Sequence, residues 1–141
     1  MSWFRKLFGR NTEEEKVDYY QEGLGLLQAG HFHEALTSFR LALREAPGDP
    51  AVLQQIAITY TRIGMTDEAA KTYRAVLERD PSAAGAHYGL AFLYLHEGRQ
   101  EEAVRHLRAF LESPPRDPEA ERHVAHARRT LAELVGEVGG G

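Results

Sequence analysis

The residues of this chain that could do chemistry are its histidines, because the sequence contains seven of them and no cysteine. Two pairs lie close together in the sequence, His31 with His33 and His123 with His126. The second pair has the i, i+3 spacing that places two side chains on one face of a helix. A structural zinc site normally needs four ligands, and no cysteine or carboxylate completes either pair in sequence. We therefore interpret both pairs as exposed surface histidines and expect no metal.

No other group of residues indicates catalysis. The sequence has no glycine-rich phosphate-binding loop and no nucleophile elbow. The acidic residues fall at predicted helix starts and on predicted solvent faces, where they favour helix formation. We expect no enzymatic activity, no catalytic residue and no cofactor.

Length and composition limit the class of protein. A chain of 141 residues suits one domain with a substantial core. A net charge of −4 gives no general attraction to nucleic acid. No apolar run approaches the roughly 18 residues of a membrane span, and residues 1–10 lack the continuous apolar region of a secretory signal. The prediction is a cytoplasmic protein, and the Arg-, Ala- and Gly-rich composition suggests a bacterial source.

The structural elements that would position a functional site recur along the chain. Glycine, alanine and proline recur in the same order with a period of 34 residues. The recurring residues are Gly30, Gly64 and Gly98, then Ala35, Ala69 and Ala103, then Pro47, Pro81 and Pro115. A period of this size indicates a solenoid of stacked units, in which each unit buries its apolar face against its neighbours. Such a surface typically holds other proteins.

Each repeat contains the signals of two helices. Apolar residues recur at helical spacing, and Gly64 ends the first helix of the middle repeat. Asp49-Pro50 and Asp117-Pro118 each place a capping acid before a proline at the first helical position. Thr12 and Glu15 fit a capping box, which allows the first helix to begin near residue 13. Helices are predicted over 13–29, 34–46, 50–63, 67–79, 84–97, 101–112 and 118–136.

Four blocks follow from these signals. Residues 1–15 form a short amphipathic segment and joint, and residues 16–117 form three repeats (16–49, 50–83 and 84–117). Residues 118–136 form a capping helix, whose apolar stripe consists of Val124, Ala125, Leu131 and Leu134. Residues 137–141 are predicted to be a flexible tail.

The repeats resemble the tetratricopeptide repeat family. The resemblance is carried by small and aromatic residues at matching positions in each unit. These are Tyr19, Gly23, Leu26, Ala35, Phe39, Ala42 and Pro47; then Leu53, Ile56, Ala57, Tyr60, Ala69, Tyr73, Val76 and Pro81; then Leu90, Ala91, Tyr94, Ala103, Leu107, Phe110 and Pro115. Departures from the pattern are Glu22, His87 and Phe110. The resemblance implies an all-α, right-handed α-solenoid of three tetratricopeptide helix pairs plus a C-terminal capping helix.

The resemblance also implies a peptide-binding groove, because the first helix of each repeat lines the concave face in this family. The matching positions carry mostly apolar and aromatic residues. They are Tyr20, Leu24, Gln54, Ile58, Arg62, Tyr88, Phe92, Leu95 and His96, and the capping helix would continue the row with Arg122, His126 and Arg129. Such a groove fits an amphipathic helix or an extended apolar segment. Alternatively, some of these residues are buried between repeats or covered by the ends of the chain.

The resemblance argues against one known kind of partner. Family members that bind the C-terminal tails of Hsp70 and Hsp90 grip the terminal carboxylate with lysine, asparagine and arginine. The matching positions here are Tyr20, Leu24, Gln55, Gly85 and Gly89. No cation stands at these positions to pair with a terminal carboxylate. The partner is therefore not expected to be an Hsp70 or Hsp90 tail.

The first ten residues form a second candidate contact. Trp3, Phe4, Leu7 and Phe8 fall on one arc of a helix, and the basic residues fall on the other arc. This pattern favours docking onto protein or the inner face of a membrane, and a disordered tail is the alternative. Together, these features predict an adaptor or scaffold with a protein or peptide partner. The alternatives are a self-assembling structural protein, which would form homo-oligomers, or a membrane-surface assembly or regulatory subunit.

Overall fold

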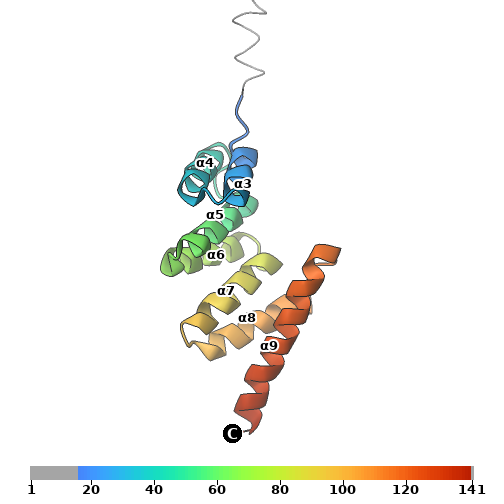
Figure 1. Cartoon of the computed structure of the whole chain (residues 1–141). Coiled ribbons are helices and arrows are strands. Elements are labelled where there is room, and N and C mark those ends of the chain that lie inside the picture. The colour runs from blue at the N-terminus through green and yellow to red at the C-terminus, as the bar shows by residue number, and fades with distance from the viewer. Residues whose placement is uncertain (1–15, 141) are drawn as a thin grey trace, which may run out of the picture.

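The structure is a computed structural model that describes residues 16–140, with the backbone alone for 137–140. Within these residues the chain is helical, and its helices stack as successive pairs (Figure 1). The elements are α3 (Tyr19–Gln28), α4 (Phe32–Glu45), α5 (Pro50–Ile63), α6 (Thr66–Arg79), α7 (Ala84–His96), α8 (Gln100–Glu112), the short 3₁₀-helix η2 (Pro118–Ala120) and α9 (Glu121–Gly140). The resulting architecture is the all-α solenoid that the sequence predicts.

Local signals set the helix ends. The Asp49 carboxylate accepts a hydrogen bond from the Ala51 N–H at 2.9 Å, which caps the start of α5. The glycine that separates the two helices of each repeat has a positive φ, namely +85° at Gly30, +94° at Gly64 and +78° at Gly98. Glycine adopts this left-handed conformation without a steric penalty, so the recurring glycine allows each sharp turn.

Two predicted helix boundaries were wrong. The first helix begins at Tyr19 and not near residue 13, because the Asp18 carboxylate caps it by accepting from the Gln21 N–H at 3.1 Å. The predicted capping box at Thr12 lies outside the described residues. The C-terminal helix begins as the separate 3₁₀ turn η2, since Asp117 makes no capping hydrogen bond, and α9 then continues to Gly140 instead of ending near residue 136.

Small residues allow the two helices of each pair to approach closely. Ala35, Ala69 and Ala103 are completely buried. In the first pair, Gly23 of α3 lies directly against the Phe39 ring, so that a Cβ atom at Gly23 would lie 2.5 Å from Phe39 Cε1. These positions therefore carry the close packing that the 34-residue pattern predicts.

A hydrogen bond between successive repeats also recurs with the 34-residue period. Arg40 Nη2 donates to the Tyr60 hydroxyl at 2.7 Å, and Arg74 Nη1 donates to the Tyr94 hydroxyl at 2.9 Å. Each bond joins the second helix of one repeat to the first helix of the next. Each therefore ties neighbouring repeats together in the same register.

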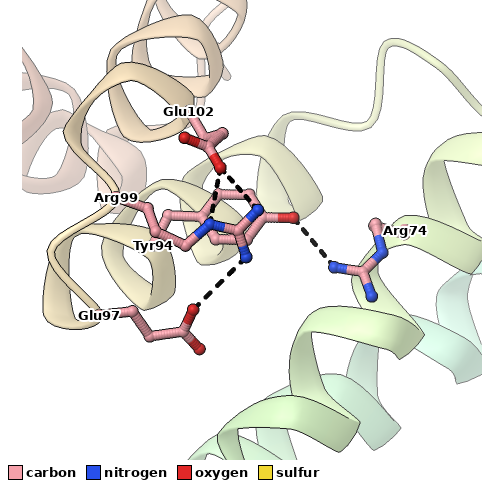
Figure 2. A network of polar contacts seen from close by, with 5 residues as sticks. All are labelled: Arg74, Tyr94, Glu97, Arg99 and Glu102. Carbon is pink, nitrogen blue, oxygen red and sulfur yellow. Dashed lines mark hydrogen bonds and ion pairs between the residues drawn. The ribbon is translucent and has the colours of Figure 1, made fainter.

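The Tyr94 hydroxyl belongs to a larger polar network at the α7–α8 turn (Figure 2). The Arg99 guanidinium lies over the Tyr94 ring, with its central carbon 4.4 Å from the ring centre. Arg99 also pairs with Glu102 at 2.6 Å and with Glu97 at 3.6 Å. The network links the turn of the third repeat to Arg74 in the second repeat.

The capping helix α9 packs against α8 and covers the apolar end of the stack. Its buried residues Ala127 and Leu134 join a core cluster with Leu107 and Phe110 of α8. Ala125, which the sequence analysis placed on this stripe, is exposed. Ala125 lies two residues from the buried Ala127 and therefore on a different side of the helix, away from the buried stripe.

Candidate functional site

A concave groove of about 840 Å³ lies between α5, α7 and the start of the capping region. The first helices of the second and third repeats supply six of the nine residues predicted for it. They are Gln54, Ile58 and Arg62 from α5 and Tyr88, Phe92 and His96 from α7. Because corresponding positions of successive repeats lie side by side, residues 34 apart in the sequence meet at one surface.

The other three predicted residues do not line this groove. Tyr20, Leu24 and Leu95 are half-buried and pack against the core clusters. Tyr20 instead lines a smaller cavity of about 250 Å³ beside the α4–α5 junction, with its ring centre 6.0 Å from that of Phe39. The groove is therefore lined by residues of the second and third repeats and of the capping region.

Residues from second helices also reach the groove, which the sequence analysis missed. They are Tyr73 of α6 and Phe110 of α8. The Tyr73 ring lies against Gly89, in the space that a Cβ atom would need. The signal available in the sequence was the spacing of Gly85 and Gly89, which are one helical turn apart on the groove face.

The aromatic residues of α7 form the centre of the groove wall. The Tyr88 ring centre lies 4.8 Å from that of Phe92 and 5.1 Å from that of Phe110. Burial raises the pKa of the Tyr88 phenol above its ordinary value. The wall is therefore apolar and closely packed, which is typical of surfaces that bind apolar ligands.

The capping helix covers one side of these aromatic rings. His123 meets Tyr88 edge-on at 5.0 Å, with its Nδ1 atom 3.2 Å from the Tyr88 hydroxyl. His126 stacks on Phe92 at 4.8 Å with an interplanar angle of 13°. Both histidines are exposed, as predicted, but each ring also rests on an aromatic residue of α7. The two side chains therefore share a face of α9, which helps to hold that helix beside the groove.

The ionisable side chains at the polar end of the groove are basic ones. Among the described residues, its lining includes Arg62, His96 and His123 and no aspartate or glutamate. The Arg62 guanidinium lies over the Phe32 ring, with its central carbon 4.9 Å from the ring centre. This contact fixes the position of the cationic group at one end of the groove.

The remaining histidines lie elsewhere. His31 and Glu34 are exposed and pair at 3.3 Å, whereas His33 makes no such pair among the described residues. A further pair, His87 and His106, joins α7 to α8, with 3.0 Å between the two Nδ1 atoms. Burial, and then the nearby His87, lower the pKa of His106 to about 4. Across residues 16–140, no three potential metal ligands lie together.

Two sequence predictions remain untested by this geometry, the contact made by the first residues of the chain and the exclusion of an Hsp70 or Hsp90 tail. Trp3, Phe4, Leu7 and Phe8 lie outside the described residues. Within the part of the chain that the structure covers, no helix is long and apolar enough to cross a membrane. The exclusion of an Hsp70 or Hsp90 tail also stays a prediction.

Stacked helix pairs around a concave groove define the class of α-solenoid repeat proteins. A profile of the tetratricopeptide repeat family matches residues 55–121. This match covers the second and third repeats, so this part of the chain is similar to the tetratricopeptide repeat family. A search of curated proteins found no match.

Solved structures share the fold at low sequence identity. The type III secretion chaperone SycD of Yersinia enterocolitica, in complex with a peptide of the translocator YopD, has a TM-score of 0.78 and 18% identity, covering 90% of this chain and 95% of SycD. PcrH, in complex with the chaperone-binding region of PopD, has a TM-score of 0.75 and 18% identity, covering 91% and 94%. YrrB, described as having an unusual peptide-binding site, has a TM-score of 0.65 and 26% identity, covering 77% of this chain and 55% of YrrB.

Proposed function

We propose that the chain is a cytoplasmic interaction adaptor or scaffold whose groove binds an apolar protein segment, either an amphipathic helix or an extended peptide. The observation that carries this proposal is the composition of the groove wall. Ile58, Tyr88, Phe92 and Phe110 all line one open concavity of about 840 Å³. A soluble protein rarely leaves such an apolar surface without a binding role.

The structural neighbours support the general class of function. SycD was solved with a peptide of the translocator YopD, and PcrH with the chaperone-binding region of PopD. They share the fold of this chain, so a groove between stacked repeats is a physically reasonable place for a peptide. Their partners are not carried over to this chain, because the identity is only 18% in both cases.

The test uses peptides selected on the intact protein from a random-peptide library. The variant Ile58→Lys places a charge on the apolar wall, and Val135→Lys introduces the same charge on an exposed residue of α9 outside the groove. Selected peptides should bind the Val135 variant as they bind the original chain and should lose affinity for the Ile58 variant. Equal affinity for both variants, with circular dichroism showing both folded, would place the binding surface elsewhere.

Ile58 is a better probe than the central aromatic residues. Tyr88 and Phe92 support His123 and His126 of the capping helix, so truncating them would also loosen α9. Loss of binding in such a variant would have two explanations. A change at Ile58 leaves these contacts in place.

Self-assembly is the alternative use of the same surface, in which one copy supplies the segment bound by another. A structure of SycD is described as an alternative dimer, so assembly occurs in a protein with this fold. Light scattering of the pure protein separates the two functions. A monomer at all concentrations supports the adaptor, and a dimer that Ile58→Lys dissociates supports self-assembly.

A further inference from the structure

The lining of the groove carries the permanent positive charge of Arg62, although the chain as a whole is negative. The chain carries a net charge of −4, yet Arg62, His96 and His123 line the groove and no aspartate or glutamate does so among the described residues. Charges of one sign in a concave apolar site attract a ligand of the opposite sign more strongly than they would in open water. The groove therefore favours a carboxylate on its ligand and disfavours an ammonium group.

Arg62 is held in a position to make that contact. It lies in the last turn of α5, and the Phe32 ring at the start of α4 lies 4.9 Å from its guanidinium carbon. Arg62 is exposed and pairs with no carboxylate among residues 16–136, whose side chains the structure describes. An aromatic ring against the flat face of a guanidinium leaves the N–H groups at its edge able to donate to a carboxylate.

His96 extends the polar end of the groove. It occupies the position of Arg62 in the next repeat, 34 residues later, and is the last residue of α7. Its ring adds a second hydrogen-bonding group at the ends of the two groove-lining helices. The apolar residues Ile58 and Tyr88 occupy earlier turns of the same helices. The groove thus has an apolar middle and a cationic end.

We propose that the groove binds an apolar protein segment that carries an aspartate or glutamate, and that this carboxylate pairs with Arg62. This inference rests on the proposed function and specifies its ligand. The chain's own residues 1–10 carry Arg5, Lys6 and Arg10 and no acidic residue, which argues against them as the occupant.

The experiment begins with peptides selected from a random-peptide library on the intact protein. Apolar residues together with an aspartate or glutamate should be enriched. Replacing that acidic residue by its amide in the tightest peptide should weaken binding to the original chain about tenfold, the loss expected for one charge-assisted hydrogen bond. Arg62→Gln should bind the acidic and amide peptides equally, and Arg62→Glu should prefer a lysine peptide.

The matched control is Arg44→Gln, which removes the same charge from the last turn of α4 at an exposed position outside the groove lining. This control should keep the full preference for the acidic peptide. Phe32→Leu should reduce the preference, because it removes the ring that holds the guanidinium.

The outcomes separate this inference from the proposed function. Peptides that require Ile58 but bind equally well in acidic and amide form would overturn the role of Arg62 and leave the groove intact as a binding site. Peptides that bind the Ile58→Lys variant as tightly as the original chain would overturn both proposals. A synthetic peptide of residues 1–10, which has no acidic residue, that binds the groove more tightly than every acidic peptide would overturn the assigned chemistry and identify the chain's own segment as the occupant.

Discussion

His87 and His106 connect the two helices of the third repeat through nitrogen atoms 3.0 Å apart. His87 Nε2 lies 2.8 Å from the Pro81 carbonyl oxygen, so this nitrogen carries the proton and donates. The His87 Nδ1 atom is then an acceptor for the Nδ1–H group of His106. The hydrogen bond needs one donor and one acceptor nitrogen, so it cannot form when both imidazoles are protonated. A positive charge on His106 is disfavoured by burial and by the neighbouring His87 and Arg105.

This pair predicts a loss of stability in acid. The pKa of His106 is about 4 in the folded protein, below its ordinary value of 6.5 in the unfolded chain. Between these values the unfolded chain binds more protons, so the free energy of unfolding falls as the pH drops from about 6.5 toward about 4. His106→Gln keeps a donor for His87 but does not titrate. Its urea midpoint should fall less between pH 7 and pH 5 than that of the original chain.

The control for this prediction is His31→Gln, because His31 is exposed and lies far from the third repeat in the sequence. It should retain the acid sensitivity of the original chain. If His106→Gln and the original chain lose stability equally over the same pH range, the acid sensitivity arises from other groups.

The helix pair α3–α4 shows how a residue without a side chain sets the packing of two elements. Gly23 and Gly25 both lie in α3, but their surroundings differ. Gly23 faces Phe39, whose ring is completely buried, whereas the space beside Gly25 is open. The same substitution at these two positions therefore separates close packing from helix propensity.

Gly23→Ala should destabilise the protein by about 1–3 kcal/mol, because its methyl group would overlap the Phe39 ring in a packed core. Gly25→Ala should stabilise it by about 0.5–1 kcal/mol, since alanine favours a helix more than glycine does and nothing obstructs the methyl group. Urea unfolding of both variants measures the difference. Stabilisation by both substitutions would show that α3 and α4 are farther apart than described.

At the scale of the whole molecule, three helix pairs and the capping helix form one continuous stack (Figure 1). Each repeat contacts mainly its neighbours, and the capping helix covers the last of them. Residues 1–10 precede all of these elements. Their removal should therefore leave the helical content of the stack unchanged.

The same truncation tests the predicted membrane contact of Trp3, Phe4, Leu7 and Phe8. Arg5, Lys6 and Arg10 should each contribute about 1 kcal/mol of attraction to an anionic surface. The full chain should sediment with anionic vesicles, and the chain lacking residues 1–10 should not. Trp3 is the single tryptophan, so its emission should shift to the blue when anionic vesicles are added. Neutral vesicles serve as the control, and equal binding of both chains to anionic vesicles would contradict the prediction.

The sequence by itself determined the fold class, the repeat period and most helix boundaries. These features depend on local physics that is written into neighbouring residues. A glycine with a positive φ ends the first helix of each repeat, and an aspartate before a proline begins α5. Recurring small residues mark the close contacts of each pair. The predicted start of the first helix was wrong because it relied on the capping pattern of Thr12 and Glu15. The hydrogen bond that caps α3 is made by Asp18.

Only the tertiary structure decided which predicted groove positions are open. The family pattern gives the three repeats equivalent groove positions, but Ile58 and Phe92 of the second and third repeats line the groove, whereas Tyr20 and Leu24 of the first repeat do not. The contact between Arg62 and Phe32 joins residues 30 positions apart in the sequence, and neither residue type predicts it.

The same limit applies to the C-terminal end of the groove. The i, i+3 spacing of His123 and His126 predicted a shared face of a helix, but not that this face would rest on Tyr88 and Phe92. The path of α9 depends on how Ala127 and Leu134 pack against α8. Side-chain packing between elements that are distant in the sequence decides such contacts, whereas local spacing decides only the elements themselves.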